Sequence, residues 1–294
     1  MSTFIEAHRE RFGVEPICRT LAVAPSSYYA GRQRPPSARA VRDAALLDAI
    51  RRVHEANYGV YGQRKVWHEL RREGVDLGRD RVARLMRAEG MRGVTRGSDV
   101  RTTVPAGEVD RWPDLVERDF HPLAPDRLWV ADLTYVRLAS GGFCYTAFVT
   151  DAFARRIVGW RVTETATAEH VLDALELAAW SRWDHSLEEL VHHSDHGSQY
   201  LALRYTERVA ELGARVSAGA VGDSYDNALA ETMFGLYRAE LIHRRGPWRS
   251  VVQVELATAA WVHWWNERRL HSALGYMPPA EYEAAYWQRQ VAAA

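Results

Sequence analysis

The N-terminal part of the chain places hydrophobic residues at helical spacing. Residues 13–30 predict two short helices separated by a turn, which is the geometry of a small helix-turn-helix. A Pro-rich hinge at 31–37 precedes a longer helix, in which apolar residues recur three or four positions apart between residues 41 and 53. This part of the chain is therefore expected to be all-α.

Two further helices are predicted over 63–72 and 79–89, and the turn between them contains Gly74 and Gly78. Together they form a second helix-turn-helix candidate. The basic residues expected to contact DNA phosphates or base edges are Arg64, Lys65, Arg79, Arg81 and Arg84. A charged helix surface that faces only solvent is the alternative explanation of the same pattern.

Beyond residue 125 the pattern changes to β-branched and aromatic runs. Three successive strands are predicted at 128–136, 143–151 and 155–163. Helices and strands then alternate, with helices expected at 168–183, 199–212 and 228–241 and strands at 187–195 and 214–219. This order predicts an α/β protein with a mixed five-stranded sheet and flanking helices.

These patterns divide the chain into four segments. A helical DNA-binding region at 1–92 is followed by a linker at 93–125, which is rich in Gly, Thr, Pro and Arg and is expected to have little fixed structure. A catalytic core at 126–242 and a C-terminal helical extension at 243–294 complete the chain.

The C-terminal extension contains four aromatic residues that suit either packing onto the core or a contact between subunits, and packing is favoured. They are Trp261, Trp264, Trp265 and Tyr276. The neighbouring Arg268, Arg269 and His271 could meet target DNA, and the sequence leaves this open.

The composition excludes several classes of protein. With 294 residues, of which 47% are hydrophobic and 26% charged, the chain is typical of a folded globular protein. Its polar start and the lack of an apolar run of about 18 residues favour a cytoplasmic protein, associated with the nucleoid when bound to DNA. Cys18 and Cys144 have no partner at zinc-ligand spacing and are expected to be packing residues.

Charge is distributed unevenly although the net charge is zero. Residues 1–104 hold 20 basic and 12 acidic side chains, whereas residues 105–294 hold 18 and 26. A basic N-terminal part suits a polyanionic partner, although a solvated helical surface would give the same counts.

Three acidic residues lie where a purely structural role is difficult to find. Asp132 is within an apolar strand, Asp195 follows a short strand, and Glu231 is on a later helix. Three carboxylates that converge in a low-dielectric site repel one another unless a hard divalent cation neutralises them. We therefore predict that they form a catalytic site that holds Mg²⁺, with Mn²⁺ as a substitute.

Arg238 stands seven residues after Glu231, two helical turns further along the same face. It could hold a DNA strand near the metal site, although an ion pair on its own helix would also explain it. Asp151 ends a strand and suits a turn. Capping explains three polar residues before the Glu231 helix, although one of them, Asp226, could also support the site; they are Asp223, Ser224 and Asp226.

Three histidines surround Asp195, at positions 192, 193 and 196. Strand alternation directs His192 and His193 to opposite faces of a sheet, so they cannot act together. Imidazole is also a poor ligand for magnesium. A zinc site is therefore not favoured.

Five segments together resemble the DDE transposases of the insertion-sequence-three family. They are LWVADLTYV around Asp132, DAFARRIVGW after the second strand, HHSDHGSQY around Asp195, GDSYDNALAET around Glu231, and WNERRLHSALGYMPPAEY near the C-terminus. Thirty-five residues separate Asp195 from Glu231, which is the spacing that gives this family's triad its name. The resemblance covers nearly the whole chain and includes the basic residue at 238 and the second helix-turn-helix, although His196 stands where the family more often has Arg. It implies an RNase H-like core like that of retroviral integrases.

The resemblance also implies a function in DNA transposition. The helical region would bind the terminal inverted repeats of the element, and the core would cleave DNA and transfer strands to target DNA, with a circular intermediate before integration. A homo-oligomer on DNA is expected, and the product of a short upstream frame is a further expected partner, as a fusion or as a separate chain. Two rival hypotheses are a DNA-binding regulator without catalysis and a nuclease that cleaves DNA without joining strands.

Overall fold

The computed structural model describes residues 1–95, 112–195, 197, 199–200, 202–219 and 228–293. The chain divides into two compact units, Met1–Arg51 and Arg52–Ala294, and each is described by itself. None of the helices in these described ranges is long and apolar enough to cross a membrane.

The first unit contains three short helices and the beginning of a long one. These are α1 Ser2–Phe12, α2 Val14–Thr20, α3 Pro25–Gln33 and α4 Ala38–Ala56. Ile5, Ile17, Cys18 and Tyr28 form their small apolar core. The pair α2 and α3 agrees with the predicted small helix-turn-helix, and α1 is an additional helix that the sequence pattern did not indicate. Its single buried residue, Ile5, explains why no apolar stripe was visible.

The second unit begins with the end of α4 and the pair α5 Gln63–Arg72 and α6 Arg79–Ala88. Each helix of the pair turns a narrow apolar stripe inward, and the buried residues are Val66, Leu70, Val82, Leu85 and Met86. The Trp67 indole N–H donates to the carbonyl of Leu77, 2.9 Å away, and so fixes the turn between the helices. The predicted helix pair at 63–72 and 79–89 is confirmed to within one residue.

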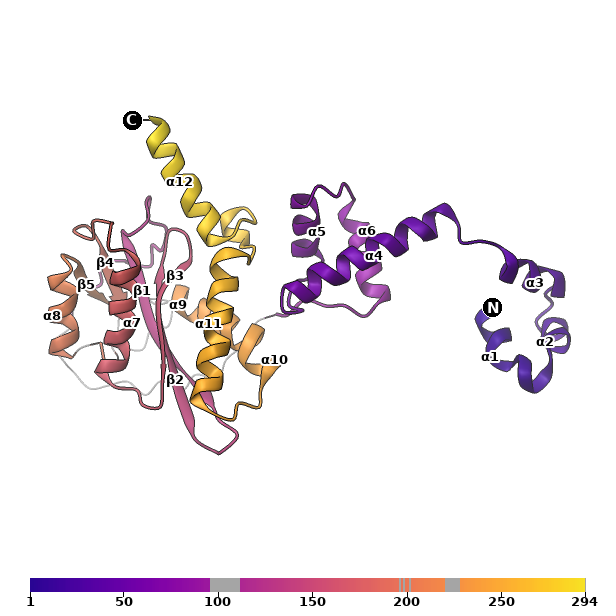
Figure 1. Ribbon diagram of the computed structural model, residues 1–294, viewed down its shortest axis with the longest axis horizontal. Coiled ribbons are helices and arrows are strands. Elements are labelled where there is room, and N and C mark those ends of the chain that lie inside the picture. The colour runs from indigo at the N-terminus through magenta and orange to yellow at the C-terminus, as the bar shows by residue number, and fades with distance from the viewer. Residues whose placement is uncertain (96–111, 196, 198, 201, 220–227, 294) are drawn as a thin grey trace. The chain divides into compact units, whose positions relative to one another are not determined.

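A mixed five-stranded sheet forms the centre of the second unit (Figure 1). Its strands are β1 Leu128–Arg137, β2 Phe143–Asp151, β3 Arg156–Thr163, β4 Val191–Ser194 and β5 Arg215–Ala218, in the spatial order β3-β2-β1-β4-β5. The first three strands are antiparallel neighbours, whereas β4 runs parallel to β1 and β5 parallel to β4. The predicted fold class is confirmed, with β4 shorter than expected.

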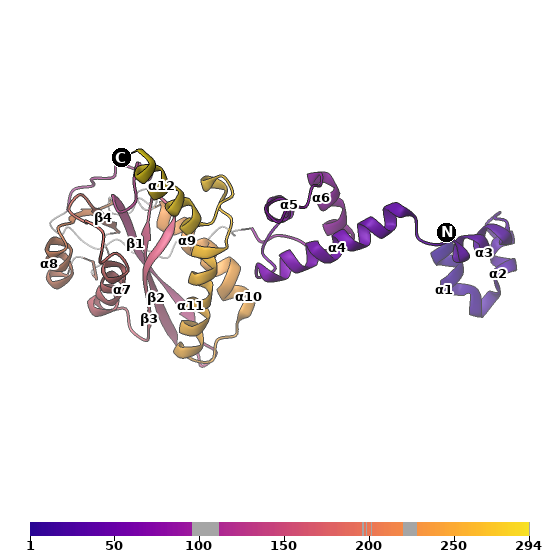
Figure 2. The same cartoon turned by 45° about the horizontal axis from the view of Figure 1, so that its top comes forward.

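Helices cover both faces of this sheet (Figure 2). Helices α7 Ala168–Ser181 and α8 Leu203–Glu211 pack on the face that carries Trp129 and Ala131. A side chain at Gly159 of β3 would meet the Ala174 carbonyl oxygen at 2.1 Å, so the glycine permits the close approach of α7.

The opposite face is covered by a helix that changes its winding and by a second long helix. The first consists of α9 Ala228–Tyr237, a π-helical turn η2 Arg238–Ile242 and α10 His243–Arg245; the second is α11 Val251–Glu267. Phe148 of β2 contacts the rings of Phe234, Tyr237 and Trp261, with centroids 5.1 to 6.0 Å apart. The predicted helix at 228–241 therefore changes from α-helical to π-helical winding at Arg238. The spacing of apolar residues in the sequence did not indicate this change.

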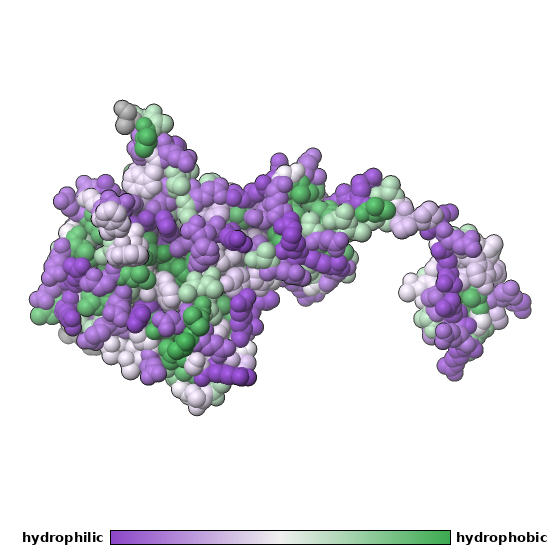
Figure 3. All heavy atoms as spheres, viewed as in Figure 1, coloured by the Kyte–Doolittle hydropathy of each residue, from purple (hydrophilic) through white to green (hydrophobic). Residues whose placement is uncertain are grey.

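The chain ends with the 3₁₀ turn η3 Ser272–Leu274 and helix α12 Pro279–Ala293. Figure 3 shows apolar side chains gathered along α11, on which Val252 and Leu256 are 62% and 68% exposed. The three tryptophans of α11 are buried, at 0%, 3% and 3% exposure, so the packing interpretation of these residues is correct.

The segment predicted as a linker lies partly outside the described residues, which resume at Trp112. From there the chain packs on the sheet, because Val116 and Phe120 are buried against Leu128 and Val130. The Leu115 N–H also donates to Ser217 Oγ at 2.9 Å. Residues 112–125 therefore differ from the expectation of little fixed structure: two apolar side chains in a Pro-rich stretch are sufficient to anchor it.

Candidate active site

The pairing of β1 with β4 brings two of the predicted acids to the same place. Val130 lies opposite His193 in this parallel ladder. Two residues further along each strand, the same register places Asp132 beside Asp195, which directly follows the end of β4. Neighbouring strands are about 4.8 Å apart, so the two carboxyl groups face one neighbourhood.

The third acid comes from the helix across the face. Ala230 packs against Val130 of β1, and Val130 is on the same side of that strand as Asp132. Glu231 is the next residue of α9 and lies in its first turn. It is exposed, whereas Asp132 is half-buried.

The electrostatics show that the three carboxyl groups affect one another. Burial raises the pKa of Asp132 well above its usual range, and the charges of Asp195 and Glu231 raise it further. A hydrogen bond from the Leu133 N–H, 2.7 Å from Asp132 Oδ1, and the positive charge of Arg238 oppose this rise in pKa. Within the described ranges, no three His, Cys, Asp or Glu side chains are grouped tightly enough to hold a metal ion.

Arg238 lies beside the same strand. It donates from Nε and Nη2 to Thr134 Oγ1, at 3.1 and 2.5 Å. Thr134 is two residues after Asp132 and therefore on the same side of β1. The sequence did not predict this contact between Arg238 and β1. It suggested two other partners for Arg238, a DNA strand or an acidic residue on the same helix.

The turn after Asp195 contains two residues that the sequence analysis did not select. The Gly197 N–H donates to Asp195 Oδ1 at 3.0 Å, and a side chain at Gly197 would come within 3.0 Å of that oxygen. Tyr200 is 2% exposed, and among the described residues its hydroxyl has no hydrogen-bond partner. Burial raises the pKa of this hydroxyl, and the charges of Asp132 and Asp195 raise it further. The motif HHSDHGSQY was the available signal for both residues.

The residues predicted to contact DNA differ in their exposure to solvent. Arg64, Arg79 and Arg84 are exposed, and Arg81 is half-buried. Lys65 is half-buried, with its ammonium group 5.1 Å from the centre of the Tyr61 ring. Burial, with a contribution from Arg269, lowers the pKa of Lys65 to about 7, so this side chain does not resemble the exposed arginines.

The histidines and the turn aspartate have structural partners. His192 Nε2 lies 2.6 Å from the Tyr205 hydroxyl, and His193 Nδ1 lies 2.9 Å from Ser217 Oγ. Tyr205 belongs to the apolar cluster on one face of the sheet, whereas the Phe120 ring, 6.0 Å from that of His193, belongs to the cluster on the other face, so the predicted divergence of the two rings is correct. Asp151 accepts hydrogen bonds from the Phe153 and Ala154 N–H groups, which confirms its role in a turn. His196, Asp223, Ser224 and Asp226 lie outside the described residues.

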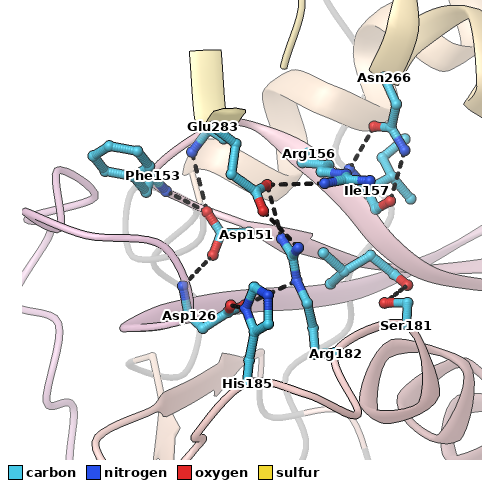
Figure 4. A network of polar contacts seen from close by, with 12 residues as sticks. Asp126, Asp151, Phe153, Arg156, Ile157, Ser181, Arg182, His185, Asn266 and Glu283 are labelled. Carbon is cyan, nitrogen blue, oxygen red and sulfur yellow. Dashed lines mark hydrogen bonds and ion pairs between the residues drawn. The ribbon is translucent and has the colours of Figure 1, made fainter. Parts of the chain in front are cut away.

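A second group of charged side chains joins α12 to the sheet (Figure 4). The Arg182 guanidinium donates to both oxygens of Glu283, at 2.6 and 2.9 Å. Asp126 Oδ1 lies 3.1 Å from Arg182 Nε, and its Oδ2 lies 2.6 Å from His185 Nδ1. Asp151 accepts a further hydrogen bond from the Asp126 N–H at 2.6 Å. Each charged side chain of this group faces an opposite charge, and Asp151 accepts from backbone N–H groups, which is typical of a structural network.

Three family profiles match the chain. The integrase core domain matches residues 122–224, a second integrase core profile matches residues 212–279, and an HTH-like domain matches residues 41–98. The sheet and these matches define the class of the protein as one with an integrase-like, RNase H-like core and a helix-turn-helix region.

The curated relatives define the family more closely. The transposase of insertion sequence element IS629 from Shigella sonnei is 49% identical, over 98% of this chain and 97% of the relative. A protein of Mycobacterium tuberculosis named as a candidate transposase for IS986/IS6110 is 55% identical, over 93% of this chain and 100% of the relative. Transposase InsF of IS3A from Escherichia coli K12 is 29% identical, over 95% of this chain and 97% of the relative. The chain belongs to the insertion-sequence transposases of the insertion-sequence-three family.

Among solved structures, similar chains are found in retroviral integrases. The catalytic core domain of HTLV-2 integrase in complex with magnesium has a TM-score of 0.44 and 14% identity, and the match covers 55% of this chain and 99% of that one. A chain of the simian T-cell lymphotropic virus intasome has a TM-score of 0.46 and 12% identity, with 79% and 73% covered.

Proposed function

We propose that this transposase binds the terminal inverted repeats of its element and catalyses metal-dependent cleavage and transfer of DNA strands. The helix-turn-helix region, within residues 1–92, would bind the repeats, and the core, within 126–242, would carry out the chemistry. Arg64, Arg79, Arg81 and Arg84 would contact phosphates or base edges. Lys65, which is half-buried beside Tyr61, would contact DNA only at the margin of this surface.

The observation that supports the catalytic proposal is that the register of β1 and β4 places Asp132 beside Asp195, where the charges of Asp195 and Glu231 add to the burial that raises the pKa of Asp132. A folded protein maintains such repulsion only when something else is gained, and oxygen ligands with an excess of negative charge fit Mg²⁺ or Mn²⁺. Asp132, Asp195 and Glu231 would hold the metal, for which their side chains must come closer together than they lie here. When bound, two divalent ions would activate a hydroxyl group and stabilise the leaving oxygen during in-line displacement at phosphorus.

The remaining residues would position the DNA. Arg238, fixed to Thr134 beside Asp132, would hold the phosphate that enters the site. Gly197 would leave space for the Asp195 carboxylate. Water would first hydrolyse one strand at an element end, and the freed 3′-hydroxyl would then attack a second phosphodiester, so that no covalent protein intermediate is needed. The two ends would be joined within a homo-oligomer, with the upstream-frame product as a fusion or a partner.

A single assay distinguishes the proposal from its rivals. The purified full-length chain is incubated with Mn²⁺ and an oligonucleotide that carries the element end. Joined products support the transposase, cleaved products alone would indicate a nuclease, and a mobility shift without chemistry would indicate a regulator. Asp132→Asn, Asp195→Asn and Glu231→Gln should each abolish the products while preserving the shift.

A further inference from the structure

The C-terminal motif WNERRLHSALGYMPPAEY contains charged residues that the proposed function does not use. Arg269 is 4% exposed and His271 is 7% exposed, so neither side chain is available at the surface for target DNA. The Arg269 guanidinium instead donates to both oxygens of Glu240, from Nε at 2.9 Å and from Nη2 at 2.6 Å. Its Cζ atom also lies 4.6 Å from the centre of the Trp265 ring. The pair is thus buried and geometrically complete.

Glu240 connects this pair to the candidate active site. It lies in the π-helical turn η2, which begins at Arg238. A π-turn is rarer than a regular helix and often marks a functional site. If the turn relaxed to an α-helix, the register would shift by one residue, which rotates a side chain by about 100° around the helix axis. Arg238 would then no longer face Thr134, so the position of Arg238 depends on what holds the turn.

The other side of Arg269 is joined to the helix-turn-helix region. The Tyr61 hydroxyl accepts a hydrogen bond from the Leu270 N–H at 2.7 Å and donates to the Arg268 carbonyl at 3.3 Å. The Trp264 indole N–H donates to Asn57 Oδ1 at 3.0 Å. Asn57 and Tyr61, which precede α5 in the chain, therefore hold the end of α11 and the residues on either side of Arg269.

We propose that Arg269 and Glu240 are positioning residues that hold the π-turn, and with it Arg238, in the orientation needed for strand transfer. The inference rests on the proposed function and extends it, because it assigns a role to a motif that would otherwise be a DNA contact. The pair acts through Arg238 and does not touch the DNA. It also makes the position of Arg238 dependent on the segment to which Tyr61 is bound.

The chain offers a matched control. Glu283 pairs with Arg182 at the same two distances, 2.6 and 2.9 Å, and both residues of that pair are 3% to 4% exposed. Glu240→Gln and Glu283→Gln thus make the same chemical change in two buried pairs, and both should lower the melting temperature. Only Glu240→Gln changes the turn that begins at Arg238.

The first experiment measures strand transfer by the two variants, normalised to the folded fraction. Glu240→Gln is expected to lower the rate at saturating DNA about 100-fold, the size of effect that a displacement of about 1 Å can produce. The concentration of donor DNA that gives half the maximal rate should stay nearly unchanged. Glu283→Gln should retain the normal rate. Equal losses in the two variants would overturn the proposal.

The second experiment tests whether the pair acts through Arg238. In the background of Arg238→Gln, the change Glu240→Gln should have no additional effect on strand transfer, because the residue through which it acts is gone. Losses that multiply would show an independent role and would contradict the inference.

The third experiment does not depend on activity. In protein labelled with ¹⁵N-arginine, the Nε–H signal of Arg238 is assigned by its loss in Arg238→Gln. It should move in Glu240→Gln and stay in place in Glu283→Gln. If the wild-type chain shows no strand transfer, the proposed function fails while this signal still tests the positioning role, and an unmoved signal would refute that role.

Discussion

The second unit contains two groups of acidic residues on the same sheet, and they are built in opposite ways. Around Asp126, Asp151 and Glu283, every carboxyl group faces an arginine, a histidine or a backbone N–H. Around Asp132, burial and the charges of Asp195 and Glu231 raise the pKa of its carboxyl group, and the Leu133 N–H and Arg238 oppose this rise only in part. Burial and Asp126 raise the pKa of Asp151 as well, but Asp151 is held by three backbone N–H groups, whereas Asp132 lies beside two further carboxyl groups.

This difference separates structure from function without reference to any relative. A buried charge with a complete set of partners can be explained by the fold alone. A buried carboxyl group whose pKa is raised by two neighbouring carboxylates needs another reason to persist, and perturbed pKa values tend to gather at functional sites. The comparison therefore makes opposite predictions for similar substitutions in the two groups.

Asp132→Asn should produce the largest effect. The amide removes the negative charge that a divalent ion requires, so strand transfer should fall by about 10³-fold or more, comparable to the loss of a catalytic residue. Stability should stay the same or increase, because repulsion with Asp195 and Glu231 disappears. Oligonucleotide joining and thermal unfolding of the same preparation measure the two quantities.

Asp126→Asn is the control for that substitution in the paired group. It weakens contacts to Arg182 and His185, so it should lower the melting temperature and leave the activity of the folded fraction unchanged. If Asp132→Asn destabilised the protein as much as Asp126→Asn, the contrast between the two groups would be lost.

Glu283→Gln should have the largest effect on stability. Arg182 is 4% exposed and would lose the charge of a partner at 2.6 Å, although Asp126 would remain beside it. Breaking a buried pair costs about 3 to 5 kcal/mol, and the remaining partner should keep the loss near the lower end. Chemical denaturation measures the free energy of unfolding. A loss no greater than that of an exposed ion pair, such as Arg208 with Glu176, would show that the network is dispensable.

The parts of the molecule that could be predicted from sequence depend on local periodicity. Strand β1 was predicted at 128–136 and spans Leu128–Arg137, since a run of β-branched and aromatic residues bounded by turn residues identifies a strand locally. Asp132 and Asp195 are 63 positions apart in the chain, and their residue type alone was enough to group them as candidate metal ligands. Their contact depends on strand polarity and register.

The paired groups could not be predicted in this way. Glu240 and Arg269 are 29 residues apart, and Arg182 and Glu283 are 101 apart. No spacing rule relates such positions, because their contact depends on how α11 and α12 pack. The same limit affected Lys65, which was predicted to contact DNA, whereas its ammonium group lies over the Tyr61 ring and burial lowers its pKa.

Gly197→Ala should have an intermediate effect on strand transfer, through the group around Asp132. The new methyl group would come within 3.0 Å of Asp195 Oδ1 and 3.1 Å of Gln199 Oε1, so the carboxylate must shift by a few tenths of an ångström. We expect a loss of strand transfer of about 10-fold to 100-fold with little change in DNA binding. Gly142→Ala, at a glycine with nothing within 4 Å, is the matched control and should retain activity. Normal activity of Gly197→Ala would mean that the position of Asp195 is not critical.

A last comparison concerns the pH dependence of stability within the paired group. Burial, aided by Asp126, raises the pKa of Asp151 to about 7. Between pH ~4 and 7 the folded protein therefore binds more protons at this residue than the unfolded chain, and its contribution to the free energy of unfolding is present at low pH and lost as the pH rises. Glu283 behaves in the opposite way: burial raises its pKa, but Arg182 and Arg156 outweigh this and lower it, so its contribution is lost as the pH falls.

These opposite signs can be measured with two variants. The stability difference between wild type and Asp151→Asn should narrow as the pH rises from about 4 to 7, whereas the difference between wild type and Glu283→Gln should narrow as the pH falls below about 4.5. Urea unfolding at a series of pH values gives both curves. If the stability differences of the two variants changed with pH in the same direction, Asp151 and Glu283 would not have opposite pKa shifts. The contrast between this network and the group around Asp132 would then be lost.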